Sequence, residues 1–322
     1  MAIQETFARD EAFWNNYLAG RPQAPDALFD RIFTYHRSQG GSFGTVHDVG
    51  AGNGPYTARL RSHFEHVIVS DIVPGNVELA RARLGSGTES GFTFRTAGIE
   101  EVDDLDPASV DMVFATNVMH FPDDQHAAMA AVARQLRPGG TFACAGFAPA
   151  RFRDAAVQAV WERIFAQGGR VLLRKLGVED DSKQAPSHRE KALRAMARSG
   201  DRYDVAPLDP AVFVPGALRI HIEMEAGTAT ELLPPEEAQA DTFVRPAYAG
   251  PDDIELWEHE DGWAFETDLA GIKTHFATFP FSSQEPEAFV ALWEDMERLL
   301  VDRKLTRVKG FWPAKVILAT KR

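Results

Sequence analysis

Residues 45–55 read Thr-Val-His-Asp-Val-Gly-Ala-Gly-Asn-Gly-Pro, and this stretch decides the fold. Glycines at positions 50, 52 and 54 remove the Cβ atom at every second residue, so the backbone can turn sharply and approach a ligand. Pro55 suits the first turn of a helix, where a backbone N–H has no helical partner. The stretch therefore predicts a strand, a tight turn and a helix from Pro55 to about His63, which is typical of a nucleotide-type cofactor loop.

The spacing of these glycines separates two kinds of cofactor. A dinucleotide loop follows G-x-G-x-x-G, which would place its third glycine where this chain has Pro55. Here the pattern is D-x-G-x-G-x-G, and the carboxylate of Asp48 suits an ammonium group better than a pyrophosphate. The next predicted strand, 66–70, ends at Asp71, which lies 23 residues after Asp48 and can bond both hydroxyls of an unphosphorylated ribose. These features favour an amino-acid-like cofactor such as S-adenosyl-L-methionine over a nicotinamide or flavin.

Later segments continue the pattern in order. Residues 92–96 read as a third strand, followed by Ala-Gly-Ile-Glu-Glu at 97–101, and residues 110–117 read as a fourth strand. Residues 136–142, LRPGGTF, predict a turn into a fifth strand, because proline stops a helix and the glycines make the bend. A glycine turn alone also occurs as a structural connector, but five ordered motifs argue against that alternative.

From Val46 to about Phe147 the chain resembles the class I S-adenosylmethionine-dependent methyltransferases. The resemblance implies an α/β fold, with a Rossmann-like, seven-stranded, mostly parallel sheet that carries helices on both faces. One departure is Gly98, which stands where many relatives have an aspartate for the adenine amino group, so adenine falls to the Ile99 backbone or to Glu100. The cofactor-binding residues that this resemblance implies are Tyr17, Arg21, Asp48, Gly50, Ala51, Gly52, Asp71, Ile72, Gly98, Ile99, Glu100, Asn117 and Val118.

The N-terminal segment carries a second resemblance. Residues 13–22, FWNNYLAGRP, followed by Pro25 and a helical stretch, look like the trans-aconitate methyltransferase-like branch of small-molecule methyltransferases. In that branch the segment covers the cofactor, which implies that Tyr17 and Arg21 lie near its methionine portion. Arginine suits this role because it holds a carboxylate through two parallel bonds. For Tyr17 the alternative is a simple amphipathic cap, packed on the core together with Trp14.

Composition and charge restrict the function further. The chain has 322 residues, of which 44% are hydrophobic and 25% charged, which suits an enzyme with a large core. Its net charge of −13 argues against nucleic acid or an anionic membrane as partner. No stretch approaches the ~18 apolar residues of a membrane span, and no signal peptide is evident, so we expect a cytoplasmic protein. The single cysteine, Cys144, lies in an apolar run and is expected in the core.

Regular alternation of strands and helices stops after Phe147, which suggests the following organisation. Apolar spacing predicts an inserted helix over 151–176, and a polar loop over 177–190 precedes a short helix over 188–198. Strands are predicted over 218–224 and 309–319, and the resemblance to the methyltransferases implies that they pair as an antiparallel hairpin beside the fifth strand. The aromatic-rich stretch between them suggests a substrate lid, although for any single aromatic there a place in the insert's own core is favoured. The expected parts are a helical cap (1–44), a cofactor-binding core (45–150), a helical insertion (151–216) and the sheet end (217–322) with a lid (about 227–300).

Methyl transfer asks little of the protein beyond orientation, because the sulfonium is already activated. A base is needed only when the acceptor carries a proton, and His120, just after the fourth strand, is the candidate. The alternative is a structural histidine that bonds a backbone carbonyl. His221 and His259 are weaker candidates, and no histidine has partners at metal-ligand spacing, so no metal site is expected.

The sequence thus predicts transfer of a methyl group to a small organic acceptor, with S-adenosylhomocysteine as second product. The acceptor atom stays open among carboxylate, hydroxyl, thiol and amine, as does the oligomeric state. The main alternative is a cyclase or pericyclase that keeps the cofactor on the same scaffold, since fold does not fix function. A protein substrate is a further possibility, whereas a vestigial binding protein is disfavoured because Asp48, Gly50, Gly52 and Asp71 are all present.

Overall fold

The computed structural model describes residues 11–85, 91–176, 188–200, 202–224, 231–240, 243–279 and 281–322. The polar loop expected over 177–190 lies, up to residue 187, outside these residues. Within the described part of the chain, no helix is both long and apolar enough to cross a membrane.

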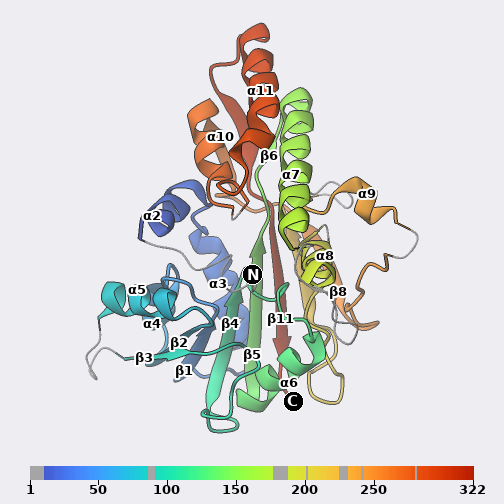
Figure 1. Cartoon of the computed structure of the whole chain (residues 1–322). Coiled ribbons are helices and arrows are strands. Elements are labelled where there is room, and N and C mark those ends of the chain that lie inside the picture. Colours follow the sequence, from blue (N-terminus) through green and yellow to red (C-terminus); the bar gives the residue numbers. More distant parts are fainter. Residues whose placement is uncertain are drawn as a thin grey trace.

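The centre of the molecule is one large sheet (Figure 1) with the strand order β3-β2-β1-β4-β5-β11-β7-β8. Strands β1 to β5 run parallel, whereas β11 runs antiparallel to both of its neighbours, β5 and β7. This confirms the α/β class and the pairing of the late strands beside β5. The strands are β1 (Thr45–Val49), β2 (His66–Asp71), β3 (Phe92–Thr96), β4 (Val110–Thr116), β5 (Leu136–Phe147), β7 (Leu218–Ile222), β8 (Ile254–Glu258) and β11 (Ala314–Thr320).

Helices cover both faces of this sheet. Residues of α3 and α4 pack in one apolar cluster with Val46 of β1 and Phe114 of β4. Residues of α6 pack in a second cluster with Val113 of β4 and with Cys144 of β5, which is fully buried, as expected. The helices of this half are α2 (Glu11–Gly20), α3 (Asp26–Ser38), α4 (Thr57–Arg61), α5 (Pro74–Leu84) and α6 (Gln125–Gln135).

The sheet has eight strands where seven were expected. The additional strand, β8, lies within the range expected for the lid and pairs in parallel with β7 along its whole length. Its Trp257 ring stacks on His221 at 3.8 Å between centroids, and Glu255 accepts a hydrogen bond from the same histidine. The sequence of β8, IELWE, is only half buried, so its apolar pattern was too weak to distinguish it from a loop.

The long strand expected over 309–319 is interrupted at Trp312 and Pro313. β10 (Val308–Phe311) joins a second sheet of order β6-β10-β9, with β6 (Arg151–Phe152) and β9 (Ala264–Thr267), whereas β11 joins the main sheet. Pro313 has no N–H for the ladder, and the Trp312 N–H donates to the carbonyl of Trp263 instead. At two places, between β5 and β6 and between β10 and β11, the chain therefore passes from one sheet into the other.

A second layer of helices gathers around this smaller sheet, beyond the carboxyl end of β5 (Figure 1). Its core contains Trp161, Phe165, Phe281 and Phe289. The expected helix over 151–176 begins only at Ala155, because the first residues form β6. The elements here are α7 (Ala155–Leu176), α10 (Leu269–Phe276), η2 (Pro286–Phe289) and α11 (Val290–Asp302). Two further helices, α8 (His188–Ser199) and α9 (Pro235–Ala238), lie lower in Figure 1, and residues of α8 form a separate apolar cluster with Leu173 and Leu233.

Candidate active site

The glycine turn after β1 has the backbone that its sequence predicts. Gly50, Gly52 and Gly54 have φ angles of +62°, +58° and +73°, a region that side-chain-bearing residues rarely adopt. A Cβ at Gly50 would lie 2.5 Å from Val118 Cγ2, and one at Gly52 would lie 2.3 Å from Trp14 Cη2. The glycines are therefore needed both for the turn and for the close approach of neighbouring elements.

The helix after this turn begins later than expected. α4 spans Thr57–Arg61, and Pro55 and Tyr56 form a turn before it, so the predicted start at Pro55 was wrong. The extra turn brings the Thr57 hydroxyl to Asp48, where it donates a hydrogen bond to Oδ2 at 2.6 Å.

Asp71, at the end of β2, holds the turn from the other side. Its Oδ2 accepts the Gly52 N–H at 2.9 Å, while Oδ1 accepts the Val73 N–H at 2.9 Å and the Asn76 side chain at 3.2 Å. The Asn76 amide oxygen in turn accepts a hydrogen bond from the Trp14 indole. Asp71 thus fixes the glycine turn and connects it to α2.

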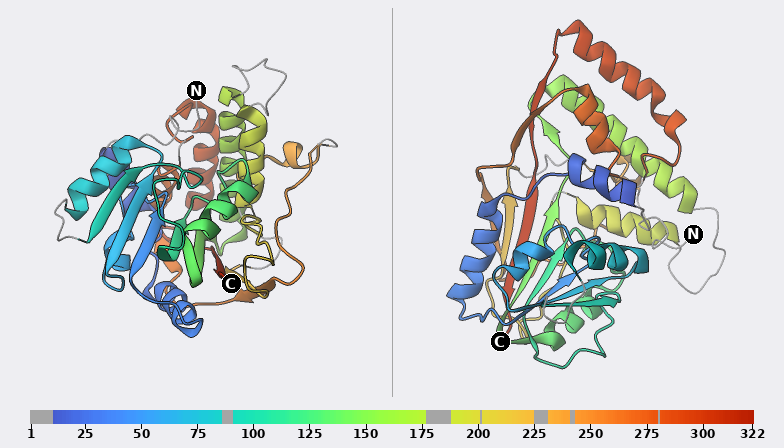
Figure 2. Two further views of the ribbon diagram at one scale, coloured as in Figure 1. Left: turned by 90° about the horizontal axis from the view of Figure 1, so that it is seen from below. Right: turned by 90° about the vertical axis from the view of Figure 1, so that its left-hand side faces the viewer.

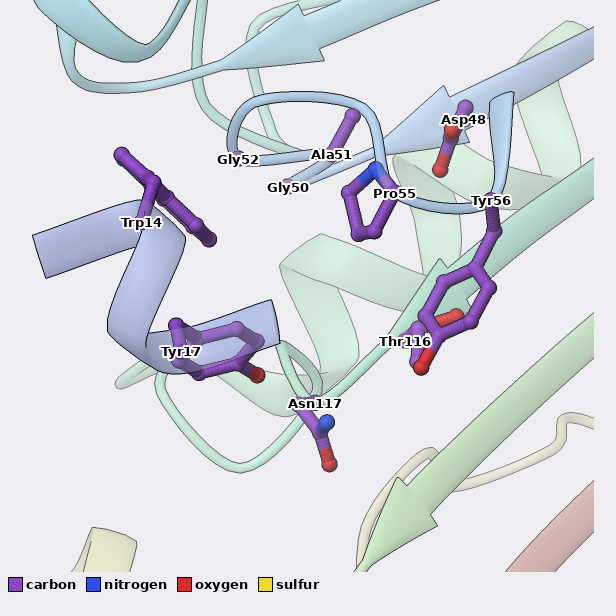
Figure 3. Close-up of a pocket in the computed structure, with 10 residues that line it drawn as sticks. All are labelled: Trp14, Tyr17, Asp48, Gly50, Ala51, Gly52, Pro55, Tyr56, Thr116 and Asn117. Atoms are coloured by element: carbon purple, nitrogen blue, oxygen red, sulfur yellow. The ribbon is translucent and has the colours of Figure 1, made fainter. Parts of the chain in front are cut away.

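A pocket opens between the glycine turn, the end of β4 and helix α2 (Figure 3). Trp14 and Tyr17 project from α2 on one side, and Tyr56 and Thr116 lie across from them. Of the expected cofactor residues, the lining includes Tyr17, Asp48, Gly50, Ala51, Gly52 and Asn117; the remaining lining residues are Trp14, Pro55, Tyr56 and Thr116.

Asp48 presents a buried carboxylate to this pocket. It is 3% exposed, and burial, together with the nearby charge of Asp71, raises its pKa to about 7, against the opposing effect of the Thr57 hydrogen bond. A carboxylate has about four acceptor positions, so one hydroxyl leaves most of its capacity unused. This is the environment that a cationic group in the pocket would complete.

Arg21 supplies the opposite charge. Burial lowers its pKa, and the effect is partly offset by Tyr17 and Tyr56. Its guanidinium lies 5.1 Å from the centre of the Tyr17 ring and 4.0 Å from that of Phe279, and within the described residues its buried Nε atom has no hydrogen-bond partner. A buried arginine with an unused donor suits a carboxylate ligand.

Asn117 forms the floor of the pocket in a strained conformation. Its φ angle is +55°, its N–H donates to the Ala145 carbonyl, and its side-chain oxygen accepts the Phe147 N–H at 2.7 Å. These bonds fix the ends of β4 and β5, and Val118 then packs against Gly50. Strain of this kind is common at ligand sites.

The residues expected around adenine lie next to one another but not in the lining of the pocket. A Cβ on Gly98 would lie 3.4 Å from a Glu100 carboxylate oxygen and 3.8 Å from the Ile72 side chain. Ile72 is 47% exposed, Ile99 is buried, and burial raises the pKa of Glu100. Ile72, Gly98 and Glu100 form a partly exposed apolar and acidic surface beside the end of β2, and Ile99 is buried next to them.

His120 lies in the loop that follows Asn117, also outside the lining of the pocket. Its ring packs 3.9 Å from Phe121, and within the described residues its buried Nδ1 has no hydrogen-bond partner. Burial, assisted by the charges of Lys315, Arg198 and Arg21, lowers its pKa to about 3. His120 is therefore a neutral ring in a positively charged environment.

Arg198, which the sequence did not single out, holds this loop. It is 1% exposed on α8 and donates to the carbonyls of His120, Pro122 and Asp123. From the other side, Gln125 donates to the Met119 carbonyl. An arginine inside a basic helix gives no sequence signal of such a role.

The weaker histidine candidates lie elsewhere. His221 packs inside the sheet against Trp257, and His259 pairs with Glu223 at the surface; neither lines the pocket. Among the residues that the structure describes, no three His, Cys, Asp or Glu side chains are grouped so as to hold a metal ion.

None of the described residues of the expected lid, from about 227 to 300, contributes to the lining of this pocket. Phe279, within this range, contacts Arg21, while α2 lies beside the glycine turn, with Trp14 against Gly52 (Figure 3). Trp14, Pro55, Tyr56 and Thr116 were the lining residues that sequence reasoning missed. Their signals were present, since Tyr56 adjoins the turn and Thr116 precedes Asn117 at the end of a strand.

Comparison with known proteins agrees with this geometry. A family model described as a methyltransferase domain matches residues 47–144. The chain is 54% identical to the methyltransferase tpcM of Aspergillus fumigatus, over 99% of this chain and 94% of that protein. It is also 54% identical to the methyltransferase AacuQ of Aspergillus aculeatus, over 98% of this chain and 95% of that protein.

Among solved structures, a putative type II methyltransferase from Anaeromyxobacter dehalogenans matches with a TM-score of 0.55 at 17% identity. The match covers 92% of this chain and 97% of that one, which supports the Rossmann-like fold. The resemblance to the trans-aconitate branch is not confirmed by these matches. The glycine turn, the strand order and relatives of high identity over nearly the whole length place the chain in the class I S-adenosylmethionine-dependent methyltransferases, with S-adenosylmethionine as its cofactor.

Proposed function

We propose that the protein methylates a small organic acceptor that carries an anionic oxygen, in the space between the cofactor pocket and His120. The observation that carries the proposal is a pair of buried, opposite charges: Asp48 lines the pocket, and Arg21 lies outside the lining but stacks on the lining residue Tyr17. They match the ammonium and carboxylate groups of an amino acid. A nicotinamide or flavin has no such pair of groups.

The residues present fit S-adenosylmethionine, which supplies a methyl group already activated on a sulfonium. Asp48 accepts hydrogen bonds from the ammonium group, and Arg21 pairs with the carboxylate. Tyr17 and Tyr56 present aromatic rings to the pocket, which suits a positively charged sulfur. Asp71 holds the turn and receives the ribose, while Ile72 and the segment Gly98–Glu100 bind the adenine.

The choice among acceptors rests on the surroundings of His120. A histidine with a pKa of about 3 is a weak base, so it is poorly suited to deprotonate an amine or an alcohol. Lys315, Arg198 and Arg21 all exert a positive charge on it. A carboxylate or an acidic phenol needs no strong base and is attracted by this potential. His120 then orients the acceptor as a neutral hydrogen-bonding partner.

A methyl-transfer assay tests this function. Purified full-length protein is incubated with S-adenosylmethionine and separate sets of aromatic carboxylic acids, phenols, thiols and amines. We expect S-adenosylhomocysteine, with a product heavier by one methyl group, from an acid or a phenol. Methylation of amines or thiols alone would contradict the proposed acceptor class. Conversion of an acceptor without cofactor consumption would instead identify the cyclase or pericyclase alternative.

Cofactor binding should depend on pH through Asp48. With a pKa of about 7 in the free protein, Asp48 is increasingly protonated below pH 7, and a protonated carboxyl cannot pair with an ammonium group. The affinity for S-adenosylhomocysteine should therefore fall about tenfold in total between pH 8 and pH 6, with most of the loss below pH 7. Calorimetric titrations at pH 6, 7 and 8 measure this effect. Asp48→Asn should bind weakly at every pH, and a wild type without pH dependence would contradict the assignment.

Replacement of His120 should affect the acceptor and not the cofactor. His120→Asn should lower kcat/KM for a phenol or acid by about tenfold, because it removes one oriented hydrogen bond near the acceptor. The dissociation constant of S-adenosylhomocysteine should stay unchanged. His126→Asn, in the neighbouring helix α6, is the matched control and should change neither quantity. A kcat/KM unaffected by His120→Asn would return His120 to a structural role.

The acidic net charge of −13 supports a small molecule over nucleic acid as the acceptor. A protein substrate would require a basic segment as its target. Adding a lysine-rich peptide to the same assay distinguishes the two classes of acceptor.

A further inference from the structure

The end of helix α2 is fastened to helix α10 by a buried histidine. His275 donates a hydrogen bond from Nδ1 to the Gly20 carbonyl at 2.7 Å, and its Nε2 accepts the Ala150 N–H at 3.2 Å. Burial, and next the charge of Arg21, hold its pKa well below the usual range. The ring is therefore neutral and carries its proton on Nδ1.

Gly20 makes this contact close. A Cβ on Gly20 would lie 2.6 Å from Thr278 Cγ2 and 2.7 Å from the Thr274 carbonyl oxygen. Both distances are too short for a real side chain, so the α2 backbone reaches its position on α10 only with glycine here. In Figure 2 (right), α2 lies between the α10–α11 region and the main sheet.

Arg21 follows Gly20 directly in the chain, so the position of Gly20 determines where Arg21 lies. Its N–H donates to the Tyr17 carbonyl, and its guanidinium rests on Phe279, whose ring also packs 5.2 Å from the His275 ring. Arg21 thus contacts α2 through Tyr17 and the segment after α10 through Phe279. The bond from His275 to Gly20 joins the two parts at the residue just before Arg21.

We propose that His275 is a positioning residue for cofactor binding. Its hydrogen bond to Gly20 fixes the end of α2 to α10 and so holds Arg21 where it can bind the methionine portion of the cofactor. The proposal rests on the proposed function, in which Arg21 pairs with the cofactor carboxylate. It gives the expected lid, residues 227–300, a role in cofactor binding even though none of its described residues lines the pocket. Helix α2 and the segment that contains α10 then act as one unit in cofactor binding.

Binding of S-adenosylhomocysteine to the full-length protein tests this proposal. His275→Leu removes both hydrogen bonds and retains an apolar side chain, and its affinity should fall about fivefold to twentyfold. His275→Asn places an amide N–H near the position of Nδ1 and should recover most of the affinity. Gly20→Ala keeps His275 but separates α2 from α10, and should weaken binding by a similar factor.

His36→Leu is the matched control. His36 is also fully buried and also makes two hydrogen bonds, to Thr141 and to the Ser42 carbonyl, but it does not contact α2. Thermal unfolding without ligand should show a loss of stability in both leucine variants. Only His275→Leu should lose affinity for S-adenosylhomocysteine.

A second readout separates positioning from general loss of structure. If His275 acts through Arg21, then Arg21→Met should remove the effect, so His275→Leu should cost no further affinity in that background. Equal binding by His275→Leu and His36→Leu, or additive losses in the double variant, would overturn the proposal while leaving the cofactor site intact. Failure of the wild type to bind would overturn the proposed function itself.

Discussion

Replacing Gly52 by valine is expected to abolish detectable cofactor binding. Gly52 has a φ of +58°, and a β-branched residue is strained in that conformation by about 1–2 kcal/mol. In addition, its Cβ would lie 2.3 Å from Trp14, so the side chain forces α2 away from the pocket. Because the turn also carries the N–H that bonds Asp71, we expect the affinity for S-adenosylhomocysteine to fall by more than about a hundredfold.

Gly75→Ala is the control for this substitution. Gly75 lies in the first turn of α5, has no atom within 4 Å of an added Cβ, and should tolerate alanine with a small gain in stability. Calorimetry with S-adenosylhomocysteine, and circular dichroism to check the fold, measure both variants. Binding by Gly52→Val close to that of the wild type would show that the ligand does not use this turn.

Asp71→Ala is expected to have the second large effect. It leaves the N–H groups of Gly52 and Val73 and the Asn76 amide without their acceptor. It also removes the acceptor that we propose for the ribose hydroxyls. An unpaired buried donor costs about 1–3 kcal/mol, so cofactor affinity should fall at least about thirtyfold and the protein should lose stability. Titration with S-adenosylhomocysteine and urea unfolding measure the two effects.

Two variants make this result specific. Asp209→Ala also removes a carboxylate that accepts the N–H of the residue two positions later, at Ala211, but it lies outside the pocket. It should leave the affinity unchanged. Asp71→Asn keeps one acceptor oxygen and should bind with intermediate affinity. If Asp71→Ala loses stability but binds normally, Asp71 serves only the fold.

The features that the sequence predicted are those that local chemistry determines. Glycines at alternating positions and a carboxylate at the end of a strand restrict the backbone wherever they occur, so the turn at 50–54 and the position of Asp71 could be predicted. The parallel strands β2 and β4 are rich in apolar residues and buried along nearly their whole length, so they were equally clear.

The features that were missed depend on contacts between distant residues. β8 exists because Trp257 and Glu255 find His221 on a strand more than thirty positions away. The interruption at Pro313 depends on Trp263, which accepts the displaced Trp312 N–H. Such pairings leave no periodic pattern in the sequence.

The site shows the same division. The residue types of Asp48 and Arg21 suggested that they bind an ammonium and a carboxylate group. The extra turn that brings Thr57 to Asp48, and the stacking of Arg21 on Phe279, could be seen only in the structure. The environment of His120 also came from elsewhere in the chain, since Arg198 and Lys315 belong to α8 and β11. The low pKa of His120 makes it a weak base, so the role proposed for it is to orient an acidic acceptor and not to abstract a proton.

The most direct test of the central claim compares two ligands by calorimetry. S-adenosylhomocysteine carries the amino-acid portion that Asp48 and Arg21 are proposed to bind, and 5′-methylthioadenosine lacks it. With two charge-assisted contacts of about 1.5 kcal/mol or more each, the wild type should bind S-adenosylhomocysteine at least about a hundredfold more tightly. The double variant Asp48→Asn with Arg21→Met should lose this preference. Equal affinity of the wild type for both ligands, or binding of neither, would contradict the account.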